Sequence, residues 1–131
     1  QRKTITIREL SDHPIMLTPA GTTFRDAIDK ELASIGVHLV PAAEVDGLRL
    51  LASLALQGHA PALLPASAAF DHPEDNWVLI RVDGLTRRSV GLIFNQRTTP
   101  STPVRSTIEV LASVVRDIAP QQPGVYLTFD H

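Results

Sequence analysis

The sequence predicts an α/β fold with a largely parallel sheet. Short apolar runs alternate along the chain with longer segments whose apolar residues recur every three or four positions. Glycine and proline stand in the short connections between these segments, where they end helices and strands. Strands that alternate with helices over short connections are typical of parallel sheets covered by helices.

In the first part of the chain, residues 8–12 can form a single helical turn that stops before Pro14, and the apolar residues 15–17 are expected to form a buried strand. A long helix is expected to begin at Thr23, because Asp26 follows at capping-box spacing, and to end at Gly36. Residues 37–40 are expected to form the next strand.

A second helix is expected from its cap at Asp46 to about residue 57; it is apolar nearly all round and should therefore be buried. Strands are expected over residues 62–64, 77–82 and 90–94, with a short helix within the loop 66–76. A third helix should begin at its cap Thr102, with Pro103 at the first helical position, and end before Pro120. Residues 120–131 are expected to form a tail.

Composition excludes several classes of function. The chain has 131 residues, a formal net charge of -2 and no cysteine, so it offers neither a basic surface for nucleic acid nor thiolate chemistry. The five histidines lack metal-ligand spacing, and no nucleophile elbow or phosphate-binding glycine motif is present. We therefore expect no catalytic residues, no metal and no cofactor. The chain also lacks a signal peptide and a membrane-spanning run, which favours a cytoplasmic location.

Two loops are candidate ligand sites because each leads into the first turn of a predicted helix. In open α/β sheets, ligands bind beyond the carboxyl ends of strands, close to free backbone N–H groups. The first loop offers hydroxyl groups and a glycine, and the second offers a carboxylate and a glycine. The candidate residues are Thr18, Gly21, Thr22 and Thr23, followed by Asp46 and Gly47. An interpretation without a ligand stays open, since the threonines and Asp46 can simply cap the two helices.

The order of these elements resembles the second half of the effector-binding domain of LysR-type transcriptional regulators. Residues 5–17 are similar to the family's leucine-to-proline entry into its second subdomain, and residues 40–46 lead into a run, residues 51–65, that resembles its glycine-rich segment ending in Leu-Pro. Residues 89–96 and 103–117 resemble the return strand and the closing helix. Ala60 replaces the second glycine of the glycine-rich run, and Pro61 follows it, so the loop geometry there is expected to differ.

The resemblance implies a type II periplasmic-binding-protein-like fold with two lobes and a cleft between them. Residues 5–83 would form one nearly complete lobe, residues 90–119 the returning part of the other lobe, and residues 120–131 a tail. The family's N-terminal DNA-binding domain is absent from this sequence, which begins without an initiator methionine, so we expect a fragment or a processed product.

The resemblance also implies a function. A small effector, for example a carboxylate or an aromatic acid, would bind between the lobes and change the geometry of a homo-oligomer on DNA, which only the absent domain contacts. Pro65 and Ala66 would join the candidate residues at the end of the third strand. An exported solute-binding protein of the same fold is the main alternative; an enzyme and an interaction module are further ones.

Overall fold

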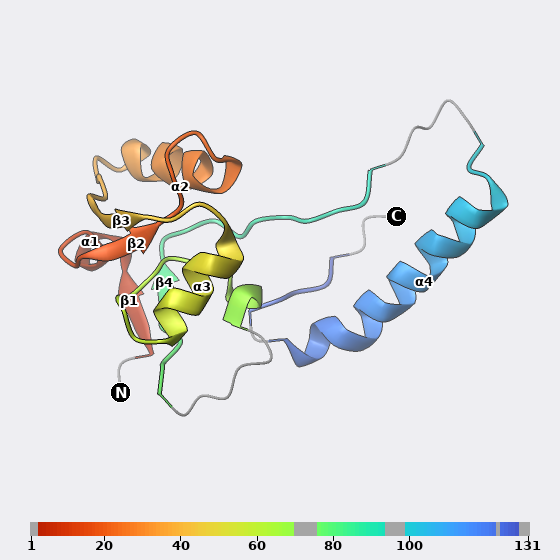
Figure 1. Ribbon diagram of the computed structural model, residues 1–131. Coiled ribbons are helices and arrows are strands. Elements are labelled where there is room, and N and C mark those ends of the chain that lie inside the picture. The colour runs from red at the N-terminus through yellow and green to blue at the C-terminus, as the bar shows by residue number, and fades with distance from the viewer. Residues whose placement is uncertain (1–2, 70–75, 94–98, 123, 129–131) are drawn as a thin grey trace. The chain divides into compact units, whose positions relative to one another are not determined.

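A computed structural model describes residues 3–69, 76–93, 99–122 and 124–128. The chain divides into two compact units, Gln1–Arg87 and Arg88–His131, which we call unit 1 and unit 2. Figure 1 shows the helices and strands of both units. Within the described residues, no helix is both long enough and apolar enough to cross a membrane.

Unit 1 alternates strands and helices, and its strands pair in parallel, which confirms the predicted α/β architecture. Its elements are, in order, β1 (Thr4–Thr6), α1 (Ile7–Leu10), β2 (Ile15–Leu17), α2 (Thr23–Ser34), β3 (Pro41–Glu44), α3 (Leu48–Leu56), the 3-10 helix η1 (Ala66–Ala69) and β4 (Arg81–Asp83). Strand β1 pairs with β4, and β2 pairs with β3. Ala62 makes a single parallel bridge to Met16 on β2.

The core of unit 1 lies where α1, α2, β2 and the segment before β3 meet. Leu17 and Leu32 are each 1% exposed. Buried residues of this cluster are Ile7, Leu10, Ile15, Leu17, Ile28, Leu32, Val37, Leu39 and Leu63, with Ile5, Phe24, Val82 and Leu85 packed against them. The apolar stripe predicted for the first long helix therefore does face a core.

Two predicted strands are displaced in unit 1. Residues 37–40 form no strand, although Val37 and Leu39 are buried, and the chain pairs with β2 only over Pro41–Glu44. Most of the expected strand 77–82 is also irregular, because β1 offers backbone partners only to Arg81–Asp83. Around β3, the buried residues are therefore not the ones that pair as a strand. An apolar run in the sequence indicates burial but not backbone pairing.

Two further expectations need correction. Of the expected strand 62–64, only Ala62 makes a bridge. Helix α3 is not buried all round: Leu51 and Ala52 are buried, but Leu50 is 55% exposed. A single apolar face of α3 packs inside unit 1, and the opposite face meets solvent. The short helix expected in residues 66–76 is present as η1.

Unit 2 contains α4 (Thr102–Ile118) and the 3-10 helix η2 (Ala119–Gln121). Ser101 is the N-cap of α4, one residue before the expected cap, and Pro103 lies in the first turn. Residues 90–93 of the expected fifth strand form no regular element, and residue 94 lies outside the described residues.

No residue of α4 is buried. Its apolar stripe consists of Val104, Ile108, Leu111, Val115 and Ile118, of which Leu111 is 45% exposed. An open apolar hollow in unit 2 is lined by Leu92, Ile93, Pro103, Val104, Thr107, Ile108 and Leu111. None of the candidate ligand residues lines this hollow.

Candidate functional site

Two of the segments that carry the candidate residues follow the parallel strands β2 and β3, and the third follows Ala62, which bridges to β2. Leu17, the last residue of β2, pairs with Glu44, the last residue of β3, and the Val45 N–H donates to the Leu17 carbonyl at 2.9 Å. On the other side of β2, the Met16 N–H donates to the Pro61 carbonyl at 2.8 Å. The chain segments beyond residues 17, 44 and 62 therefore leave the sheet at the same edge, which is where open α/β sheets bind ligands.

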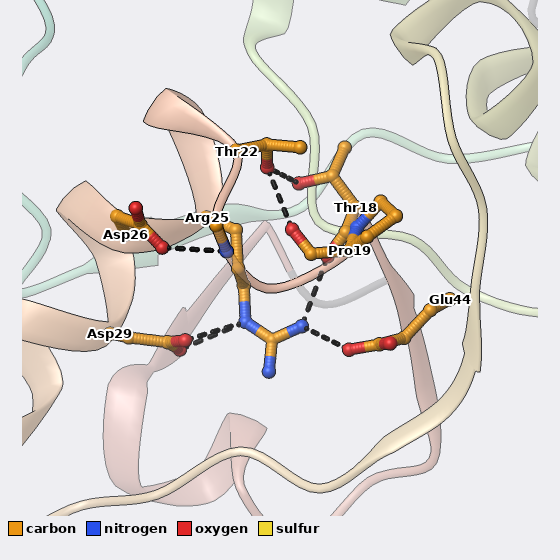
Figure 2. Close-up of polar contacts among 8 residues, drawn as sticks. Thr18, Pro19, Thr22, Arg25, Asp26, Asp29 and Glu44 are labelled. Atoms are coloured by element: carbon orange, nitrogen blue, oxygen red, sulfur yellow. Dashed lines mark hydrogen bonds and ion pairs between the residues drawn. The ribbon is translucent and has the colours of Figure 1, made fainter.

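The first segment, residues 18–23, is held by its own hydroxyl groups. The Thr22 hydroxyl donates to the Pro19 carbonyl at 2.8 Å and lies 3.1 Å from the hydroxyl of Thr18 (Figure 2). Thr18 is only 4% exposed, whereas Gly21 and Thr23 are exposed. The two threonine hydroxyls therefore stabilise the shape of the loop, and its exposed surface is formed by Ala20, Gly21 and Thr23.

The expected cap of the first long helix is wrong by one residue. Thr22, not Thr23, is the N-cap of α2, and its side chain makes no capping hydrogen bond. The Asp26 carboxylate instead accepts a hydrogen bond from the Gly21 N–H at 2.9 Å. Gly21 has a backbone φ of +87°, a conformation that favours glycine. The Asp26 carboxylate therefore accepts from a backbone N–H two positions before Thr23, the residue that the capping-box spacing indicated.

The Arg25 side chain makes hydrogen bonds to three residues close to this loop. Its Nε donates to both oxygens of Asp29, at 2.9 and 2.8 Å, and its Nη1 donates to the Thr18 carbonyl and to Glu44, both at 3.0 Å (Figure 2). Arg25 is only 7% exposed. Burial alone would lower the pKa of Arg25, but hydrogen bonds and charges of Asp29 and Glu44 outweigh it, so the pKa is raised and the guanidinium stays charged.

The second segment, residues 45–47, connects β3 with α3. Asp46 and Gly47 are both exposed. The expected cap at Asp46 is wrong, because Gly47 occupies the N-cap position and no side chain makes a capping hydrogen bond there. Gly47 has φ of +93° and ψ of +118°, and its carbonyl accepts the first hydrogen bond of the helix from the Leu51 N–H at 3.0 Å. The Asp46 carboxylate is thus not engaged as the cap of α3.

The third segment contains Pro65 and Ala66, which are both partly buried. The Pro65 carbonyl accepts a hydrogen bond from the Ala68 N–H at 2.9 Å, and Ala66 is the first residue of η1. Neither side chain has a polar group, so these two residues can offer shape and backbone groups at this edge but no charge.

The sequence analysis missed Arg25 and Glu44. The available signal was the position of Arg25: it lies three residues before Ile28 and seven before Leu32, on the buried face of α2. A charged residue in an apolar stripe indicates a buried ion pair. Among the described residues, the structure holds no cluster of histidine, aspartate and glutamate suited to a metal ion.

A comparison with models of protein families identifies the chain. The model of the LysR substrate binding domain matches residues 1–116. The chain belongs to this family. A search of curated proteins found no match. LysR substrate binding domains are periplasmic-binding-protein-like, and the helices and parallel strands described above agree with a partial domain of this kind. They are effector-binding regulatory domains of transcriptional regulators, which typically act as DNA-binding oligomers.

Proposed function

We propose that this LysR substrate binding domain senses a small organic acid at the sheet edge formed by residues 18–23, 45–47 and 65–66. The observation that carries the proposal is that these three segments follow β2, β3 and the Ala62 bridge at the same edge. The first turn of α2 offers backbone N–H groups and the positive end of the helix dipole, which favour a carboxylate. Gly21 and Gly47 carry no side chain that would keep a ligand from the backbone.

The two units support a two-lobed receptor. In this proposal residues 5–83 form one lobe and residues 90–119 return to the other, in agreement with the division of the chain between Arg87 and Arg88. The effector binds better to one arrangement of the lobes and shifts the population toward it, which changes the geometry of the oligomer on DNA in the cytoplasm. No covalent chemistry takes part.

The test measures the binding of four acids (benzoate, salicylate, succinate and citrate) to the 131-residue chain. Calorimetry gives the affinity, and amide chemical shifts show which residues the acid affects. We expect at least one acid to shift the amide signals of residues 18–23 and 45–47. The double variant Thr22→Val/Thr23→Val should weaken its binding about tenfold or more, because it removes the Thr23 hydroxyl as a donor to the charged group and the Thr22 hydroxyl that holds the loop.

Thr107→Val is the matched control. The Thr107 hydroxyl donates to the Pro103 carbonyl at 2.8 Å, as the Thr22 hydroxyl does to Pro19, but Thr107 lies on α4. This variant should bind the acid as the unchanged chain does. If Thr107→Val weakens binding and the double variant does not, the ligand site is the hollow of unit 2 and the proposed edge is wrong. Failure of all four acids to bind would overturn the proposed ligand class.

A second measurement concerns DNA. The chain carries a net charge of -2, so it lacks the positive charge that phosphate contacts require. In a gel-shift assay we expect no sequence-selective binding of duplex DNA by this chain. Tight, selective binding would contradict the proposal that DNA is contacted by a different domain.

A further inference from the structure

Arg25 connects the two segments that flank the proposed ligand site. Its side chain extends from the first turns of α2 and contacts Thr18, the residue that follows β2, and Glu44, the last residue of β3. These two acceptors lie at the beginnings of the segments that carry Gly21 and Gly47. A single nitrogen, Nη1, donates to both, at 3.0 Å each (Figure 2).

Asp29 fixes the direction of the guanidinium. It lies one turn after Arg25 on α2 and accepts from Nε with both oxygens. The planar guanidinium is thereby held along one edge, and Nη1 can point only toward Thr18 and Glu44. A lysine ammonium has no such planar fork and cannot keep three acceptors at fixed directions.

The backbone pairing next to this contact is short. Strands β2 and β3 have three and four residues, and their register is irregular between the pairs of Ile15 and Met16. Beyond Leu17 the backbone contributes the hydrogen bond from the Val45 N–H. Arg25 adds one buried and one partly buried charge-assisted hydrogen bond at the point where the two segments separate, and such bonds are stronger than neutral ones.

We propose that Arg25 is a positioning residue that fixes the spacing between the residue 18–23 loop and the residue 45–47 segment. That this spacing serves an effector rests on the proposed function above; the positioning itself does not. A ligand that contacts one segment then meets the other at a set distance, and movement of either segment is transmitted to its neighbour through the guanidinium.

The first test needs no ligand. Amide hydrogen exchange is measured by NMR on the full chain for Glu44→Gln and Arg25→Lys, with Glu109→Gln and Arg49→Lys as matched controls. In both test variants the amides of Gly21, Thr22 and Val45, which are hydrogen-bonded in unit 1, should exchange about tenfold faster or more. The amides of Leu32 and Leu51 should keep their rates, as should all amides of unit 1 in the controls.

This pattern separates positioning from general stability. A variant that is merely less stable accelerates the slowest core amides by a common factor, because these exchange through global unfolding. The proposal is overturned if Glu44→Gln leaves Gly21 and Thr22 unchanged, or if loop and core amides accelerate equally. If Arg25→Lys does not fold, Glu44→Gln alone decides, since it changes a half-exposed carboxylate and leaves Arg25 paired with Asp29.

The second test uses whichever of the four acids binds. Removing the negative charge of Glu44 would by simple electrostatics strengthen binding of an anion nearby. The positioning role predicts the opposite sign: Glu44→Gln should weaken binding about tenfold. Unchanged or tighter binding by Glu44→Gln contradicts the role of Arg25. If the exchange result is as expected but no acid binds, the positioning is supported and the proposed ligand class fails.

Discussion

Helices α2 and α4 share an amphipathic sequence but differ in what they contact. In α2, Ile28 and Leu32 are 7% and 1% exposed and pack into the core of unit 1, whereas α4 is longer and has no buried residue. Most of the stability of an amphipathic helix comes from packing of its apolar face. The comparison teaches that an apolar stripe predicts a helix and the side that prefers burial, but not whether this chain supplies the surface that buries it.

The largest expected effect tests this difference directly. Leu32→Ala should lower the free energy of unfolding of unit 1 by about 2–5 kcal/mol, because it removes a fully buried side chain and leaves a cavity. Leu111→Ala on α4 should change it by about 0.5 kcal/mol or less. Urea unfolding followed by the fluorescence of Trp77, the single tryptophan, reports on unit 1. A large loss in Leu111→Ala would contradict the difference drawn here between the two helices.

An intermediate effect is expected at Gly47. A Cβ at this position meets no atom within 4 Å, so Gly47→Ala tests backbone strain at φ of +93° without a steric clash. The strain should cost about 1–3 kcal/mol in urea unfolding. Gly91→Ala in unit 2 is the control, because its Cβ also meets open space and its φ lies outside the positive region. Equal losses in the two variants would contradict the role of Gly47 in turning the chain into α3.

The smallest expected effect concerns the contact between Glu31 on α2 and Thr86, near the end of unit 1. The Glu31 carboxylate on α2 accepts hydrogen bonds from both the N–H and the hydroxyl of Thr86, each at 2.6 Å. Glu31→Ala should lower stability by about 1 kcal/mol, since the contact is exposed to solvent, and should accelerate exchange of the Thr86 amide. Glu109→Ala on α4 changes the same residue type on a helix without this contact and should leave the Thr86 amide unaffected.

Helices were predictable because each has an apolar stripe with a recognisable start and end. The expected helices at residues 23, 46 and 102 are present, with starts displaced by no more than two residues. Strands were less predictable because a strand is defined by its partner. Val37 and Leu39 are buried without pairing, whereas Pro41–Glu44 pairs although three of its four residues are exposed.

For the candidate site, the sequence predicted the loops but not their connection. Residues 18–23 and 46–47 could be chosen because loops at helix starts follow strand ends in α/β folds. The ion pair of Arg25 with Glu44 joins residues nineteen positions apart, and no local spacing rule covers that distance. The single local sign was an arginine on the apolar stripe of α2.

The parallel pair of β1 and β4 has a consequence for synthesis of the chain. Strand β1 leaves the ribosome before the other strands of unit 1, but its partner is Arg81–Asp83. Strand β2 can pair with β3 earlier in synthesis, whereas β1 can pair only after nearly all of unit 1 has been made. Contacts of such high sequence separation close slowly because a long loop must be ordered first. The N-terminal strand is therefore expected to be the last strand of unit 1 to find its place, and a chain released before residue 83 would present β1 as an unpaired edge.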